Sequence, residues 1–423
     1  MKTPFASSAL LLCVLPLVSC GDDHQHAVTS ARAAGRAEVV DAAADPSQRA
    51  LLELAFEAAS RFPTSPHKKN RGRAQGLVLA GCFDLGLPLL ALRFAPQAEG
   101  WRRGAAYADF VYHAARQGVT EGARRYLALA SEVVDAESAV PNAQQWRLDT
   151  VRLKIARALA AVGDLDGAQQ TAGAIDASSR GAVDPDWSTT VASRVVDMDL
   201  DAARRDLALI TDSFEGQSLG EQGSSLSVLS AMHGRFFSDR ELREQLEERL
   251  LVRYVKLPAA LRLEAIAPLV GHYLANDQAE GAREIVAQLA TLVERTRWRP
   301  EDKLPALARM AELRADLGDV DLARQELEAA LVYYHEVRGE IFDIYRCDAL
   351  RPVGLAFAHL GDRERALDLL ATALEEGVQN PNARPRCDDL VETCVAMASR
   401  RIEPPAEMFD RMRAVCAGLN EPW

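Results

Sequence analysis

The sequence predicts an all-α protein, a solenoid of about eight to nine stacked helical hairpins. Three features of residues 46–423 support this fold class. Apolar residues recur at spacings of three and four, no stretch keeps the two-residue alternation of a strand, and a short segment containing Gly-Asp returns along the chain. The chain has 423 residues, which is long for one compact domain but suits an elongated array.

The composition of the chain indicates which kinds of partner it can bind. Hydrophobic residues make up 48% of the chain and charged residues 26%, as in an ordinary folded protein. The 49 Lys and Arg residues stand against 61 Asp and Glu residues, which leaves a net charge of −12. Because binding to nucleic acid requires a basic stripe, we expect no nucleic-acid partner.

The first element is an export signal. An apolar run over residues 5–18 is too short to cross a bilayer as a helix, so residues 1–19 are predicted to be a signal peptide. The run ends in LVSCG around Cys20, which resembles the lipobox of bacterial lipoproteins. The resemblance implies that Cys20 is lipidated and anchors the protein in the cell envelope. With Gly21 rather than aspartate after it, the outer membrane is expected. A plain secretory signal with an incidental Cys20 is the alternative.

The next two elements lead into the folded part. Residues 20–45 carry the lipidated cysteine and are small, polar and charged, which predicts a flexible tether. His24 and His26 lie in this stretch, where nothing holds the geometry that a metal needs. Residues 46–62 form an amphipathic helix that we expect to cap the N-terminal end of the array. The repeat domain is predicted to cover residues 46–423.

The repeating unit is clearest in three segments that align without gaps. Each contains a Gly-Asp pair followed, four residues after the aspartate, by an alanine: Gly163-Asp164 with Ala168, Gly318-Asp319 with Ala323, and Gly361-Asp362 with Ala366. A left-handed glycine ends one helix, the aspartate caps the next, and the alanine lets the two helices approach closely. Weaker copies have this reference position at Gly86, Ala123, Ala203, Leu242, Ala282 and Ala406.

Large and small residues keep fixed offsets from the reference alanine. In the copy at Ala366 they are Leu350, Val353, Gly354 and Phe357 before it and Leu370 and Ala373 after it. This order is similar to that of the tetratricopeptide repeat, and the match covers roughly residues 70–420 with longer periods than the usual 34 or so residues. The resemblance implies a superhelix in which the first helix of each hairpin lines a concave groove.

That resemblance also implies where a partner would bind, because the groove residues fall between the core columns. The candidate groove residues are Asp109, Tyr112, Arg116, Lys154 and Arg157 in the early hairpins, Ala231 and Gly271 in the middle, and Arg309, Glu312 and Arg351 in the later ones. The small middle residues would leave room for a helix or an extended peptide. Alternatively, they only permit tight helix stacking.

Five cysteines remain once Cys13 is removed with the signal and Cys20 is lipidated. In an antiparallel terminal hairpin, Cys387 would lie opposite Cys416, so this pair could form a disulfide in an exported protein. A bond between Cys347 and Cys387 and a set of five free buried thiols are the alternatives.

The sequence contains no recognisable catalytic signature. The pair His335-Glu336 has no second histidine one turn later, and the glycine-rich stretch 220–225 lacks the strand and the Gly-Lys-Ser of a phosphate loop. We therefore expect no catalytic residue, metal or cofactor.

The function expected from these features is a membrane-anchored lipoprotein that binds a protein or peptide and is not an enzyme. One alternative is an α/α-toroid enzyme acting on cell-wall glycan, which would close on itself and direct paired carboxylates and aromatic rings into a lumen. The aromatic content of 6% speaks against it. A solenoid that senses a small molecule is the other alternative.

Overall fold

The computed structural model describes residues 38–423 except 177–194, 196–197, 254 and 256. Within these residues the protein contains eighteen α-helices and no strand, which confirms the all-α prediction. Helices that follow one another along the chain pack together as antiparallel hairpins. Eight hairpins are described in full. Of the expected fourth hairpin only the second helix, α9, is described, because its first helix would lie in residues 177–194.

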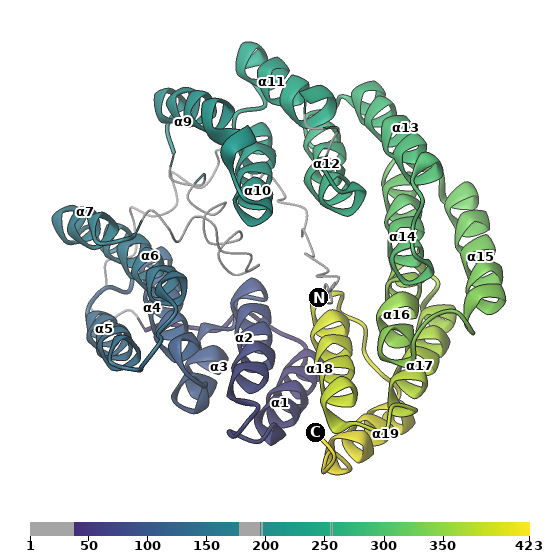
Figure 1. The fold of residues 1–423 in the computed structure, drawn as a ribbon, viewed down its shortest axis with the longest axis horizontal. Helices are drawn as coiled ribbons and strands as arrows, with labels where there is room; N and C mark the ends of the chain where they lie inside the picture. The colour runs from purple at the N-terminus through teal and green to yellow at the C-terminus, as the bar shows by residue number, and fades with distance from the viewer. Residues whose placement is uncertain (1–37, 177–194, 196–197, 254, 256) are drawn as a thin grey trace.

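The hairpins are arranged in two layers around a ring (Figure 1). The inner layer consists of α2 (Lys68–Asp84), α4 (Trp101–Arg116), α6 (Gln145–Ala161), α10 (Leu219–Arg235), α12 (Ala259–Leu274), α14 (Pro300–Asp316), α16 (Asp343–His359) and α18 (Ala383–Ser399). The outer layer consists of α1 (Pro46–Arg61), α3 (Pro88–Phe94), α5 (Arg124–Ser138), α7 (Leu165–Gly173), α9 (Leu200–Ser213), α11 (Arg240–Glu247), α13 (Ala279–Arg295), α15 (Val320–Val337), α17 (Arg363–Val378) and α19 (Ala406–Ala417).

The turns inside the hairpins have the predicted chemistry. Gly163, Gly318 and Gly361 have φ angles of +84°, +89° and +80°, which a side chain would strain. The Asp164 side chain accepts a hydrogen bond from the backbone N–H of Gly167, and Asp362 caps α17 in the same way. Asp319 makes no side-chain hydrogen bond to the start of α15, so the predicted aspartate cap is present in two of the three clear copies, whereas the left-handed glycine is present in all three.

The first hairpin has a different register from the one predicted. Gly86 itself has φ +69°, so it occupies the glycine position of the turn and not the alanine position. The reference position five residues later is Ala91, which is fully buried in α3. A weak copy can be misaligned by one turn because small residues occupy both columns.

The two ends of the chain pack against each other, and we call this contact the closure of the ring; the passage from α7 to α9 lies outside the described residues. Helix α1 packs against α18, α2 and α19 rather than capping an open end, which corrects the expectation for residues 46–62. Buried Gln48 of α1 donates a hydrogen bond of 2.8 Å from Nε2 to the carbonyl oxygen of Ala398. Side chains of Leu52 and Val395 meet at Gly81 of α2, where a Cβ would lie 3.1 Å from Val395. One hydrophobic core thus joins residues 51–158 with residues 355–419.

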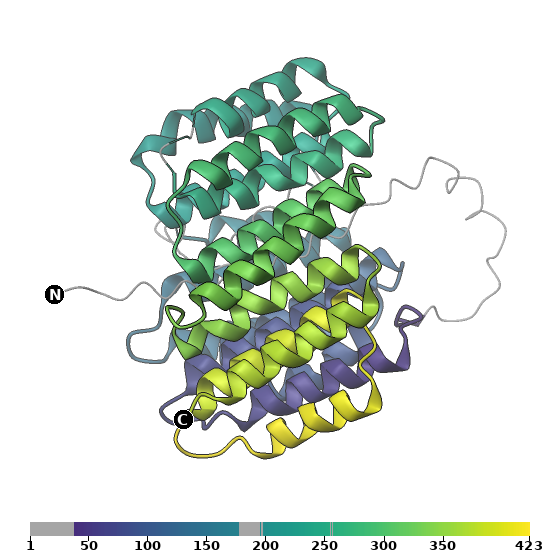
Figure 2. The same cartoon turned by 90° about the vertical axis from the view of Figure 1, so that its right-hand side faces the viewer.

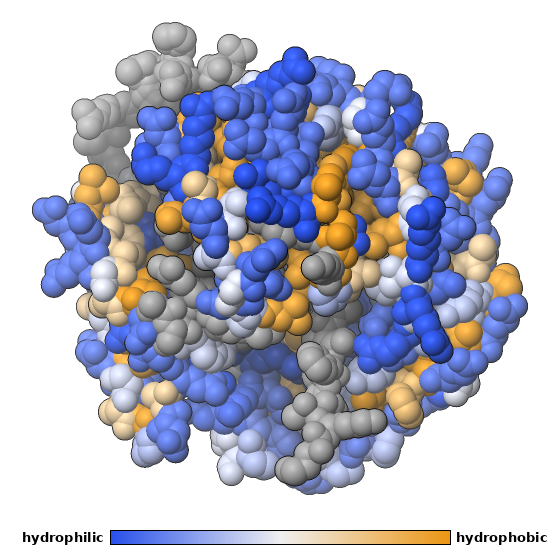
Figure 3. Space-filling view, turned by 45° about the horizontal axis from the view of Figure 1, so that its top comes forward, coloured by the Kyte–Doolittle hydropathy of each residue, from blue (hydrophilic) through white to orange (hydrophobic). Residues whose placement is uncertain are grey.

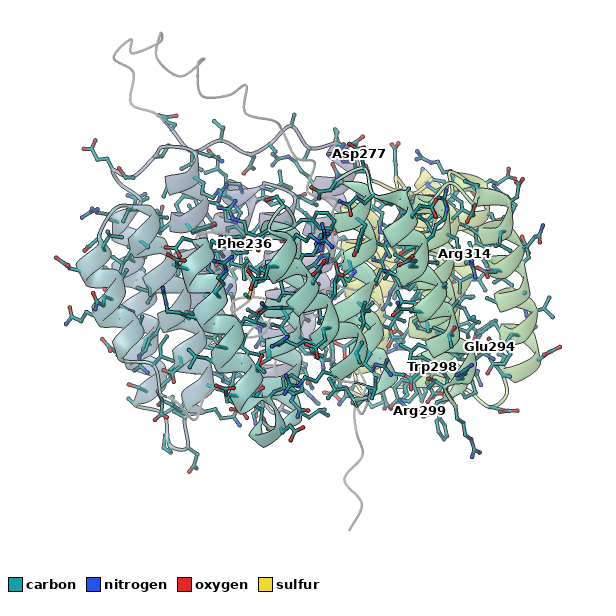
Figure 4. The ribbon with its side chains drawn as sticks, turned by 90° about the horizontal axis from the view of Figure 1, so that it is seen from above. Phe236, Asp277, Glu294, Trp298, Arg299 and Arg314 are labelled. Carbon is teal, nitrogen blue, oxygen red and sulfur yellow. The ribbon has the colours of Figure 1, made fainter. Side chains whose placement is uncertain are left out.

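The helices run between two rims of the ring (Figure 2). The turn inside the α12–α13 hairpin, with Asp277, lies at one rim, and the loop to the next hairpin, with Trp298 and Arg299, lies at the other (Figure 4). We call the first the turn rim.

The last part of the predicted tether lies on the turn rim. The Val40 backbone exchanges two hydrogen bonds with the Gln117 side chain, of 2.9 and 2.8 Å. The Ala42 N–H donates to the carbonyl oxygen of Gly86 at 2.7 Å, and the Asp41 carboxylate accepts from the Leu89 N–H at the same distance. Residues 38–45 are therefore attached to the folded ring, and their predicted assignment to a flexible tether is wrong for this stretch.

Candidate functional site

The inner layer of helices defines the surface that a partner inside the ring would meet. Each inner helix packs against an outer helix and against at least one inner helix; α6 and α10 have a described inner neighbour on one side only, because residues 177–194 between them lie outside the described ranges (Figure 1). An exposed position in the middle of such a helix therefore faces the interior of the ring. We call these positions the inner wall. In the space-filling view, apolar side chains form separate patches on a largely hydrophilic face (Figure 3).

The predicted groove residues of α4 and α6 lie together on this wall. Lys154 Nζ pairs with Asp109 Oδ2 at 2.7 Å. The Arg157 guanidinium stacks over the Tyr112 ring at 3.5 Å from its centroid, and Arg116 Nη1 donates to Tyr112 Oη at 3.2 Å. We call these five residues the cationic section. Tyr112 itself is buried, because the two arginines cover its ring.

The cationic section has an excess of positive charge. Asp109 is matched by Lys154, whereas no ion pair joins Arg116 or Arg157 to any residue that the structure describes. Burial raises the pKa of nearby Asp84 to about 6, with Lys154 opposing, so this carboxyl is mostly ionised at neutral pH and offsets only one of the two arginine charges. A partner with negative charge is therefore favoured here.

In chain order, two small residues of the inner wall lie between the cationic section and the later hairpins. Ala231 on α10 is half-buried and Gly271 on α12 is exposed. A Cβ at Gly271 would have no atom of a described residue within 4 Å, so the described part of the wall leaves space in front of it. We call Ala231 and Gly271 the small-residue section.

The predicted groove residues of α14 and α16 lie in buried ion pairs instead. Arg351 is only 3% exposed and pairs with Asp348 at 2.7 Å and with Glu392 of α18. Glu312 is 5% exposed and accepts from Arg309 and Arg400, at 2.9 and 2.7 Å. The expectation that Arg351 and Glu312 line an open groove is therefore wrong.

The closure of the ring explains this burial. Arg400 lies at the end of α18, 88 residues from Glu312, and reaches it beside α16. On α2, Arg73 pairs with Asp388 of α18 at 2.9 Å. Since α1 and α2 hold α18 in place, charged groups that would face solvent in an open groove are brought within pairing distance of one another.

The charges of this second group nearly cancel. We call Arg73, Asp348, Arg351, Asp388 and Glu392 the balanced section. Burial raises the pKa of Glu392 to about 8, although Arg351 opposes it, so this carboxyl holds its proton at neutral pH. The two arginines are then matched by Asp348 and Asp388. The neighbouring Asp389 is buried, and burial raises its pKa well above the usual value.

This arrangement predicts a pH effect on stability. Glu392 binds its proton more tightly in the folded protein than in the unfolded chain, where its pKa is near 4.5. Its contribution is complete below that value and is lost as the pH rises through about 8. We therefore expect the free energy of unfolding of the wild type to fall, relative to Glu392→Gln, in urea titrations from about pH 5 to about pH 9.

The matched control is Glu375→Gln on the outer layer. A hydrogen bond from Arg411 lowers the pKa of Glu375, so its contribution is present at neutral pH and is lost on acidification. Relative to the wild type, Glu392→Gln should therefore lose most stability at low pH, whereas Glu375→Gln should lose most stability at neutral pH. Parallel stability curves for the wild type and Glu392→Gln would contradict the assignment of the bound proton to Glu392.

The sequence indicates only some of the residues of the balanced section. Asp348 and Asp388 follow cysteines in equivalent Arg-Cys-Asp segments of neighbouring hairpins. This similarity indicates that the two aspartates occupy the same position in their hairpins. Arg73, Glu392 and Arg400 have no such signal. They join the site through contacts between helices that are far apart in the chain.

The cysteines are all unpaired in the described part of the chain. Cys82, Cys347, Cys387, Cys394 and Cys416 are buried free thiols, so the predicted bond between Cys387 and Cys416 is not formed. Cys387 Sγ instead donates to the carbonyl oxygen of Ala58 at 3.2 Å, across the closure of the ring. Cys20 lies outside the described residues.

The remaining features of the described residues concern membrane spans, metal sites and pockets. Within the described ranges no helix is long and apolar enough to cross a bilayer, and no group of three or more His, Cys, Asp or Glu residues is placed to hold a metal ion. A shallow hollow of about 410 Å³ lies apart from the inner wall, beside the loop between α15 and α16.

Comparison with known proteins finds no matching family model, no matching curated protein and no matching solved structure.

Proposed function

We propose that the protein is a membrane-anchored bacterial lipoprotein, a divergent relative of tetratricopeptide-repeat proteins, that binds a protein or peptide segment on its inner wall. Cys20 would carry the lipid, and Gly21 after it favours the outer membrane. The ring would act as a scaffold without catalysis.

One observation carries this proposal. The wall carries two arginines that make no ion pair with any described residue in the cationic section, and it leaves space in front of Gly271 in the small-residue section. The two arginines offer planar donors to carboxylates, and the open space accommodates the backbone of a bound segment. The balanced section contributes rigidity rather than affinity, since its charges are already paired.

The test uses two tryptophan substitutions at the small-residue section. The partner is first captured by crosslinking in the native host and identified by mass spectrometry. Ala231→Trp together with Gly271→Trp is then expected to abolish its recovery in a pulldown, because the indole rings fill the open space in front of the wall. Helicity measured by circular dichroism should not change.

Val332→Trp is the matched control, because Val332 is 59% exposed on the outer helix α15. This variant should recover the partner as well as the wild type does. Equal recovery by the double variant and the wild type would discard the inner wall as the binding surface.

A glycan-cleaving toroid enzyme is the second candidate. Two observations favour it: α1 and α2 pack against α18, and Glu392, whose raised pKa keeps it protonated, could act as a general acid. Its other carboxylates are less suitable, because Asp348 and Asp388 are paired with arginines. Release of sugars from purified cell-wall glycan by the wild type, lost in Glu392→Gln, would replace the scaffold with this enzyme.

A further inference from the structure

Two histidines face each other across neighbouring inner helices, away from the charged sections described above. His233 of α10 and His272 of α12 lie with their Nδ1 atoms 3.0 Å apart. Their ring planes differ by 29° and their centroids are 5.3 Å apart. His233 is fully buried, and the His272 ring lies over Gly234, where a Cβ would be 2.5 Å from Nε2. The glycine therefore permits this close contact.

A carboxylate on the outer layer determines which nitrogens carry hydrogen. Glu247 of α11 lies 3.1 Å from His233 Nε2 and accepts a hydrogen bond of 2.5 Å from Tyr273 Oη. Burial alone would raise the pKa of Glu247, but the hydrogen bonds from His233 and Tyr273 outweigh it and lower the pKa. Since Glu247 is ionised, His233 Nε2 must donate to it.

The geometry then limits the number of protons between the rings. With its Nε2 protonated, neutral His233 accepts at Nδ1 from the Nδ1–H of His272. If His233 gains a proton, it donates to a bare Nδ1 of His272 instead, and the contact survives. If both Nδ1 atoms carry hydrogen, two N–H groups point at each other and two positive charges are adjacent, so the contact must break.

The geometry points to an acid-sensitive joint between the α10–α11 and α12–α13 hairpins, which holds while His233 and His272 share at most one proton between their Nδ1 atoms and opens when a second arrives. Protonation of His272 opens it once His233 already carries a hydrogen at Nδ1, because only then do two Nδ1–H groups face each other. Burial, and next the charge of His233, lower the pKa of His272 to about 4, which places this step on the acidic side of neutrality.

Other charged groups around the joint act at a distance from His272. On α11, Arg243 Nε lies 3.5 Å from Glu247 Oε1, and on α13 Glu284 acts on Tyr273. From α10 only His233 acts on the charge of His272, and no charged group of α14 does so within the described part. Glu264, two turns earlier on α12, has its pKa raised to about 7 by burial and titrates before the joint opens.

The joint adjoins the small-residue section. Gly271 precedes His272 directly, and Ala231 lies two residues before His233. Separation of α10 from α12 would therefore widen the wall at this place. The inference does not depend on the proposed function, because it concerns two helices of the chain and requires no partner.

Hydrogen exchange of the full folded chain tests the joint. Between pH 6 and pH 4, protection factors in α10 and α12 of the wild type are expected to fall about tenfold relative to those in α16. His272→Gln cannot take up the second proton and should lose this fall. His359→Gln is the matched control, since His359 ends another inner helix and pairs with Asp316 at 2.7 Å, and it should behave as the wild type does.

Two results would overturn the joint. One is a wild type whose α10 and α12 lose no more protection than α16, and the other is a fall of equal size in His272→Gln. Should His272→Gln be unfolded at pH 7, His272→Phe provides the non-titrating side chain. Imidazole NMR of the wild type gives an independent readout. Uptake of two protons by the pair without any change in α10 or α12 amide signals also overturns the proposal.

Discussion

Replacing Leu52 by alanine is expected to lower the free energy of unfolding by about 2–5 kcal/mol. Leu52 of α1 is fully buried and meets Gly81 of α2 beside Val395 of α18. The substitution removes apolar contacts from three helices and leaves a cavity that close-packed neighbours fill only in part. Because these helices come from opposite ends of the chain, the damage should appear at both ends.

Urea denaturation measures the loss of stability, and hydrogen exchange locates it. Amide protection should fall in α18 as well as in α1, although the two are separated by more than 300 residues, as the hydrogen bond between Gln48 and Ala398 indicates. Leu89→Ala is the matched control, because Leu89 is 41% exposed, and it should change stability by no more than about 0.5 kcal/mol. Protection lost only in residues 46–61 would contradict closure of the ring by α1.

Arg351→Ala is expected to cost about 3–5 kcal/mol, a similarly large effect with a different cause. The Arg351 guanidinium pairs with Asp348 and Glu392 while almost fully buried. Its removal leaves acidic groups in the wall of the ring without a cation. Without Arg351, which opposes the effect of burial, the pKa of Glu392 rises further, so protonation of Glu392 relieves part of the penalty. The deficit relative to the wild type should therefore shrink as the pH falls from about 8 to about 5.

Thermal and urea unfolding at the two pH values measure this deficit. Arg411→Ala is the matched control, since Arg411 makes a bidentate pair with Glu375 at 2.6 and 2.8 Å on the exposed outer layer. Its loss should cost at most about 1 kcal/mol. An Arg351→Ala deficit that is as small as this, or that grows on acidification, would show that the balanced section does not hold α16 and α18 together.

Much of the local structure could be predicted from single segments. The turns at Gly163, Gly318 and Gly361 are determined by a glycine with positive φ, and neighbouring residues supply the caps. Likewise, the fixed offsets of large and small residues predict which positions are buried, as Leu350, Val353 and Phe357 are. Such features depend on residues within one or two helical turns, so the sequence displays them directly.

The candidate site could be predicted only in part. The repeat spacing places the residues of the cationic section on the first helices of adjacent hairpins, α4 and α6, and the structure brings them into contact. Arg351 and Glu312 were assigned to an open groove and are buried. Their partners Glu392 and Arg400 are in the last inner helix, and no spacing rule indicates that this helix lies close to them.

The sequence by itself determined the all-α hairpins, their turns and the order in which they stack, since each of these depends on short-range patterns of glycine, capping and apolar residues. Only the tertiary structure decided that α1 packs against α18, which charges are paired on the inner wall, and that His233 meets His272. The curvature that brings these groups together is the sum of small rotations between successive hairpins. Each rotation is set by side-chain packing over the whole interface, and no local motif records the total.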